Sequence, residues 1–177
     1  RAAAWKRHAS TPSAKATFAL EVVIPQGQSA YSNMPVASSA EANGKQVVRF
    51  ATSPRMSSYL LHLTVGDLER ISRKAAGVEI GIVTRKGAAE QGRVALDAAT
   101  EILPWYNDYF GTSYPLPKLD MIAVPGTSQF FGAMENWGAI MYFEQALLMD
   151  PQISSESDRL NIYDAVAHEM AHQWFGN

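Results

Sequence analysis

The feature that most constrains the fold is a pair of histidines near the end of the chain. His168 and His172 are four residues apart, and Glu169 directly follows the first of them. An α-helix makes one turn in about 3.6 residues, so residues four apart lie on the same face. The segment must therefore be helical if both imidazoles are to reach one metal ion. His-Glu-x-x-His on a helix is the two-histidine part of a zinc hydrolase site.

The beginning of this helix is marked by Ser155 and Asp158, because Ser-x-x-Asp can form a capping box. The helix is expected to run through about Phe175. Apolar residues are spread widely around it, and this width predicts a largely buried helix.

Glu169 is suited to acid–base chemistry at such a site. It is offset from His168 by about 100° around the helix, so it can face a zinc-bound water without being a ligand. Zinc lowers the pKa of its water to about 7, and a nearby carboxylate can take the remaining proton as a general base. The alternative is a surface helix that carries these residues by chance. We favour the metal site, because polar groups within an apolar segment need partners.

Composition describes a folding globular protein and excludes several classes of function. The net charge is −2 and 47% of the residues are hydrophobic, which gives no reason to expect binding to nucleic acid or to an anionic membrane surface. The chain has no cysteine, which excludes disulfides and thiolate ligands. No apolar run approaches the roughly 18 residues that span a bilayer, so no membrane segment is expected. These features predict neither a cellular location nor an oligomeric state.

The first half of the chain has the pattern of short β-strands. Strands are expected within residues 15–25, 47–52, 59–65 and 78–84, which are rich in β-branched and aromatic residues. Residues 38–45 are polar and are expected to form a loop, with a hairpin turn at Asn43-Gly44. This part predicts a sheet or a sandwich.

The pattern changes near residue 86. The apolar spacing over residues 88–110 predicts a helix, which Pro104 should kink or interrupt. Strands are predicted at 119–124 and 139–143, on either side of a glycine-containing loop at 126–132. The fold class is therefore α+β, with a β-rich domain over 1–86 and a second domain over 87–177.

A second polar motif, Gly-Ala-Met-Glu-Asn, occupies residues 132–136, about 30 residues before the histidines. Small residues at Gly132 and Ala133 let a ligand approach the backbone closely. Glu135 could hold a cationic group, and Asn136 offers both a hydrogen-bond donor and an acceptor. Alone, the motif also fits a turn with a solvated glutamate. Its pairing with the histidine motif favours a substrate site.

Together the two motifs resemble the M1 (gluzincin) family of zinc aminopeptidases, of the aminopeptidase N type. The similarity covers essentially residues 15–177, including 32–35 and 114–120. It implies that 1–86 is the C-terminal part of an N-terminal β-saddle domain. Residues 87–177 would then be the N-terminal part of a thermolysin-like zinc metallopeptidase domain. The chain is expected to be a fragment truncated at both ends.

The resemblance also implies a role for each motif residue. His168 and His172 would bind one Zn²⁺, and Glu169 would be the general base. Glu135 would hold the free α-amino group of the substrate by charge-assisted hydrogen bonds. The other substrate-binding residues would be Gly132 and Ala133 against the substrate backbone, Met134 in the pocket for the first side chain, and Asn136. The family's third zinc ligand, a glutamate, and its catalytic tyrosine would follow Asn177.

The predicted function is that of a zinc metalloaminopeptidase, a hydrolase that removes the N-terminal residue from peptides with a free amino terminus through a zinc-bound water. One alternative is a bifunctional epoxide hydrolase and aminopeptidase of the same superfamily. Those enzymes tend to read Gly-Gly-Met-Glu-Asn, so Ala133 argues against it. Another is a non-catalytic folding or interaction fragment. With two ligands and no catalytic tyrosine, the 177 residues are expected to be inactive by themselves.

Overall fold

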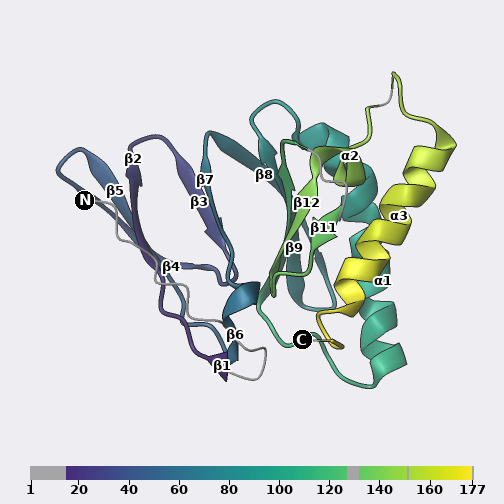
Figure 1. Ribbon diagram of the computed structural model, residues 1–177, viewed down its shortest axis with the longest axis horizontal. Coiled ribbons are helices and arrows are strands. Elements are labelled where there is room, and N and C mark those ends of the chain that lie inside the picture. The colour runs from purple at the N-terminus through teal and green to yellow at the C-terminus, as the bar shows by residue number, and fades with distance from the viewer. Residues whose placement is uncertain (1–14, 127–131, 151, 177) are drawn as a thin grey trace.

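The centre of the protein is a five-stranded mixed sheet (Figure 1). The computed structural model describes residues 15–126, 132–150 and 152–176, so most of the predicted loop at 126–132 lies outside the described residues. The strand order is β11-β12-β10-β9-β8. In chain order the strands are β8 (Leu68–Ala75), β9 (Val78–Arg85), β10 (Lys118–Val124), β11 (Ala133–Met134) and β12 (Ala139–Phe143). The three central strands are parallel, and β8 and β11 pair antiparallel at the two edges.

Two helices cover one face of this sheet. They are α1 (Arg93–Phe110), which follows the 3₁₀ helix η2 (Ala89–Gly92), and α3 (Glu156–Ala171), and Figure 1 shows both on the same side. A short helix, α2 (Glu144–Leu147), directly follows β12. Alternate residues of β9, β10 and β12 enter the main core beneath the helices. They include Ile80, Ile82, Leu119, Met121, Ile140 and Tyr142, each with no exposed surface.

The N-terminal strands lie on the other side of the sheet, away from the helices (Figure 1). A three-stranded sheet has the order β2 (Glu21–Pro25), β5 (Lys45–Phe50), β4 (Val36–Ala42). Two further pairs are β3 (Ser29–Ser32) with β7 (Leu63–Gly66), and β1 (Lys15–Ala16) with β6 (Met56–Ser57). The 3₁₀ helix η1 (Ser58–Leu60) connects β6 to the segment that leads into β7. Their small core contains Ile24, Ala30, Val48 and Phe50.

The β pattern of the first half is confirmed in part, with differences at several strands. Asn43 and Gly44 form the predicted turn, with φ of 53° and 70°. Residues 38–42, expected in a loop, instead belong to β4, whose residues are all exposed. Strands β3 and β8 were not predicted either, and within the expected strand at 59–65 the strand β7 begins only at Leu63. Neither β4 nor β8 has a fully buried residue, so both lack the buried alternate positions that make a strand visible in a sequence.

The two long helices also differ from prediction in detail. Helix α1 continues through Pro104, because the apolar residues around that position pack onto the sheet and offset one lost hydrogen bond. Helix α3 begins at the predicted capping box of Ser155 and Asp158 but ends at Ala171. The expectation of a largely buried helix is wrong, since residues 156–161 are all exposed and Leu160 exposes 59% of its surface.

The α+β fold class is confirmed. The division of the chain at residue 86 stays a prediction, and the central sheet continues across that point, because β9 before it pairs with β10 after it. Among the helices of the described residues, none has the length and apolarity that a membrane crossing requires.

The partly buried position of His62 predicts a loss of stability in acid. Burial lowers the pKa of His62 from 6.5 to about 4, and the nearby positive charge of Lys118 adds to the effect. Between these two pH values the unfolded chain binds a proton that the folded chain does not, so stability falls as pH falls from about 6.5 to about 4. The slope approaches about 1.4 kcal/mol per pH unit.

We expect His62→Gln to make the free energy of unfolding depend less on pH between about 4 and 6.5. The substitution should change the free energy of unfolding less near pH 7 than in this range. Denaturant unfolding at pH 7 and pH 5 measures this pH dependence, with the unaltered protein as the reference. An identical pH dependence in both proteins would contradict the assignment to His62.

Candidate functional site

The two motif histidines converge at the C-terminal end of α3. Their Nε2 atoms are 3.3 Å apart, and their ring centroids are 5.0 Å apart. A tetrahedral zinc ion with Zn–N bonds of about 2.0–2.1 Å holds two nitrogens roughly 3.3–3.4 Å apart. The spacing of His168 and His172 therefore fits two ligands of one zinc ion. Within the described residues, no group of three or more acidic, histidine or cysteine side chains is arranged to hold a metal.

The ring of His172 is oriented by the turn that ends α3. Its Nδ1 lies 3.2 Å from the carbonyl oxygen of Phe175. A carbonyl can only accept, so Nδ1 donates the proton and the neutral ring presents an unprotonated Nε2. Gly176 makes room for this turn, because its φ is +97° and a Cβ there would lie 3.0 Å from the same nitrogen. Such a hydrogen bond typically orients a metal-binding histidine.

Glu169 lies beneath the two histidines and exposes only 9% of its surface. Its Oε2 atom is buried and has no hydrogen-bond partner among the described residues. Burial raises the pKa of this carboxyl, the two histidines oppose the rise, and Glu135 adds to it. A buried carboxylate with a raised pKa is suited to accepting a proton.

The second motif forms the edge of the central sheet nearest to these residues. In β11, Ala133 pairs with Tyr142 and Met134 pairs with Met141. Just before the strand, the Gly132 carbonyl accepts a hydrogen bond of 3.0 Å from Phe143. In the described part of the sheet β11 has a neighbour on one side only. An edge strand of this kind can pair with an extended peptide.

Glu135 follows this edge and carries a negative charge close to Glu169. The carboxylate is half-buried, and its charge acts on both Glu169 and Tyr59. None of the ion pairs found among the described residues involves Glu135. Two neighbouring carboxylates create a local negative potential that favours a cation.

Asn136 is turned away from solvent. It is 5% exposed, and its amide donates to the Leu60 carbonyl at 3.3 Å. The side chain therefore joins the motif to η1 of the N-terminal part. The structure thus brings Glu135, Glu169 and the histidine pair to one region, with Asn136 supporting it from behind.

Gln173 was not predicted as a functional residue, although it directly follows His172. It is 3% exposed, its Oε1 accepts from the Gly138 amide at 2.9 Å, and its Nε2 donates to the Glu135 carbonyl at 3.3 Å. The Trp137 ring nitrogen donates to the backbone carbonyl of Gln173 at 3.3 Å. One side chain therefore holds the glutamate motif beside the histidine motif. The sequence signal for this role was a polar residue directly after the apolar face of a helix.

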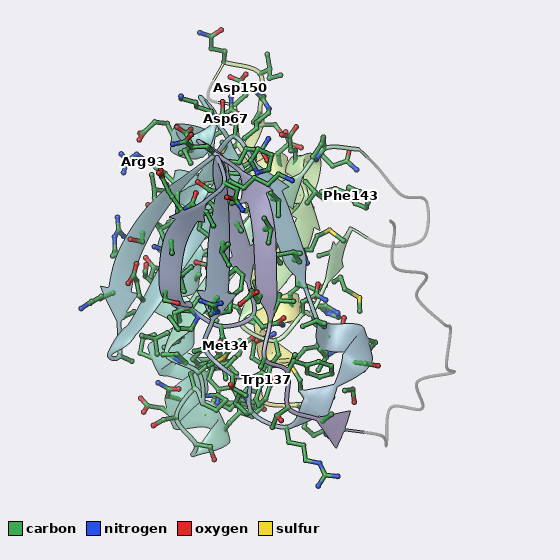
Figure 2. The ribbon with its side chains drawn as sticks, turned by 90° about the vertical axis from the view of Figure 1, so that its left-hand side faces the viewer. Met34, Asp67, Arg93, Trp137, Phe143 and Asp150 are labelled. Carbon is green, nitrogen blue, oxygen red and sulfur yellow. The ribbon has the colours of Figure 1, made fainter. Side chains whose placement is uncertain are left out.

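Two more residues missed by the sequence reasoning hold the same turn from the opposite side. Asn33 donates to the Trp137 carbonyl at 2.8 Å, and the Lys118 ammonium donates to the Gly138 carbonyl at 2.8 Å. Figure 2 shows Trp137 at the same end of the molecule as Met34, the residue after Asn33. Both polar groups are buried, so each hydrogen bond is formed where water cannot compete.

Comparison with known families agrees with this geometry. The sequence matches the Peptidase family M1 domain over residues 94–177 and the Peptidase M1 N-terminal domain over residues 9–60. The first match contains the histidine motif, the glutamate motif, α3 and all of α1 except its first residue.

The relatives of this chain carry aminopeptidase names. It is 50% identical to aminopeptidase N of Acetobacter pasteurianus over 167 residues, which are 94% of this chain and 47% of that protein. It is 47% identical to puromycin-sensitive aminopeptidase of Caenorhabditis elegans, covering 94% of this chain and 18% of that protein. It is 42% identical to leucyl aminopeptidase of Saccharolobus solfataricus, covering 94% of this chain and 21% of that protein. The chain thus spans less than half the length of these relatives.

The turn at Gly138 should tolerate no side chain. Its φ is +75°, and a Cβ would lie 2.6 Å from the Asn33 carbonyl oxygen and 2.7 Å from Leu116. We expect Gly138→Ala to lower the free energy of unfolding by about 3 kcal/mol or more.

Gly44→Ala is the matched control, since Gly44 has a similar φ of +70° with no atom within 4 Å. Gly44→Ala should lower the free energy of unfolding only by the backbone strain, about 1–2 kcal/mol. Equal losses in denaturant unfolding would show that the close approach at Gly138 is not a constraint.

Proposed function

The chain belongs to peptidase family M1, and on that premise we propose that its protein is a zinc-dependent aminopeptidase. The observation that carries the proposal is the meeting of three groups in one region. These are the paired nitrogens of His168 and His172, the buried carboxylate of Glu169, and the carboxylate of Glu135. Relatives named as aminopeptidases, identical at 42–50% of positions, support the same activity.

We propose one Zn²⁺ as the cofactor, with His168 and His172 as two of its ligands. The spacing of 3.3 Å between their Nε2 atoms and the orientation of His172 by the Phe175 carbonyl support this assignment. When bound, zinc supplies a Lewis acid that polarises a carbonyl oxygen and acidifies a water molecule.

Glu169 is proposed as the general base. It lies between the two ligands in sequence but on a different face of α3, and its carboxylate is largely shielded from bulk water. It would accept a proton from the attacking water and pass it to the leaving amine. Raised proton affinity assists the acceptance, because a carboxyl with an ordinary pKa is a weak base at neutral pH.

Glu135 is proposed to hold the free α-amino group of a peptide. An ammonium group entering the region would meet the charges of two carboxylates, Glu135 and Glu169. Charge-assisted hydrogen bonds to Glu135 would fix the amino terminus at one distance from the histidine pair. This arrangement would limit cleavage to the first peptide bond. Gly132, Ala133 and Met134 would support the substrate along the β11 edge, and Asn136 would hold that edge in place through Leu60.

Replacing the proposed base should abolish turnover without removing the metal. In the whole protein, Glu169→Gln is expected to lower kcat at least about 100-fold, because the amide cannot accept the proton. Zinc content, measured by metal analysis, should stay unchanged. Glu156→Gln makes the same change at an exposed position on the first turn of the same helix and should retain full activity. Retained turnover in Glu169→Gln would contradict the assignment.

Removing the amino-group anchor should weaken selection for a free amino terminus. For Glu135→Gln we expect kcat/KM for an unblocked peptide to fall by about 10- to 100-fold, as for loss of a hydrogen bond between charged groups. The unaltered protein should reject the same peptide once its amino group is acetylated. Efficient cleavage of the acetylated peptide would argue against an aminopeptidase.

A further inference from the structure

Two buried polar side-chain atoms lack a hydrogen-bond partner in the described part of the chain. They are the hydroxyl of Tyr142 and the Oε2 of Glu169. A buried polar group without a partner is costly, and native proteins pair nearly all such groups with protein or with ordered water. Both belong to the same part of the fold, because Glu169 is on α3 and Tyr142 is in one core cluster with Val166 and Met170 of that helix.

The fold places Tyr142 beneath the proposed catalytic helix. It lies on β12 next to Ala133 of the glutamate motif, and its side chain has no exposed surface. It belongs to the core between the sheet and the two long helices, together with Val166 and Met170 of α3. Burial raises the pKa of Tyr142, and the negative charge of Glu169 raises it further.

We propose that the Tyr142 hydroxyl holds the Glu169 carboxylate through one buried water molecule and is a positioning residue for the reaction. Among the residues that the structure describes, neither atom has a direct hydrogen-bond partner, so the link needs a water. The hydroxyl donates toward Glu169 through the water, so one carboxylate oxygen is fixed and the other can face the substrate. The inference rests on the proposed function of Glu169.

The alternative is that Tyr142 is an unpaired hydroxyl retained only for the packing of its ring. The two cases predict opposite changes in stability when the hydroxyl oxygen is removed. Deleting an unpaired buried hydroxyl leaves stability unchanged or improves it, whereas deleting a paired one leaves its partners unsatisfied and destabilises the protein.

The test compares Tyr142→Phe with Tyr114→Phe in the whole protein. Tyr114 is also buried, at 6% exposure, but its hydroxyl donates to the Lys118 carbonyl at 3.1 Å. Both variants should lower the melting temperature. Only Tyr142→Phe should lower kcat, by about fivefold or more, with KM and zinc content within twofold of the unaltered protein. Tyr114→Phe should leave kcat and KM unchanged.

A double-mutant cycle decides the link to Glu169 independently of activity. The destabilisation by Tyr142→Phe should disappear when Glu169 is already alanine, and the destabilisation by Tyr114→Phe should persist there. A Tyr142→Phe protein as stable as the unaltered one, or more stable, would overturn the proposal, as would an equal loss in both backgrounds. If the unaltered protein hydrolyses no peptide, the proposed function fails, and the stability cycle still decides the role of Tyr142.

Discussion

The arrangement of the site depends on the peptide of Gly138, which is held from three directions. Its amide donates to Gln173, which follows α3, and its carbonyl accepts from Lys118 of β10. On the third side the Asn33 backbone lies too close for any Cβ. Since the glutamate motif and the histidine motif are about 30 residues apart, their relative position is set by such contacts and not by the chain between them.

A buried ion-pair network gives this junction its rigidity. Asp120 pairs with Lys118 at 2.8 Å and with Arg70 at 2.8 Å, so β10 and β8 are joined across β9. The Lys118 ammonium also donates to the Ser32 carbonyl in β3. Gly81 of β9 makes the space, because a Cβ there would contact the Arg70 guanidinium. Removing one partner of such a network would leave a buried charge unpaired, so the groups depend on one another.

The elements that sequence reasoning predicted well have a strong local cause. The hairpin at Asn43-Gly44 needs two residues with positive φ, and the capping box at Ser155 needs only residues within one turn. Strands β4 and β8 were not predicted because edge strands without a fully buried face resemble polar loops in sequence. The end of α3 was placed too late, because the turn that follows it is stabilised by Gln173 contacting another segment.

The sequence by itself determined the proposed chemistry: four-residue spacing on a helix brings two imidazoles together, and that is a property of helix geometry alone. Only the tertiary structure decided which groups surround them. Glu135 comes close to Glu169 because β11 is an edge strand beside α3, and Tyr142 is buried beneath the same helix because β12 pairs with β11. The physical reason is that burial, charge proximity and hydrogen-bond pairing depend on contacts between distant segments, which local spacing does not encode.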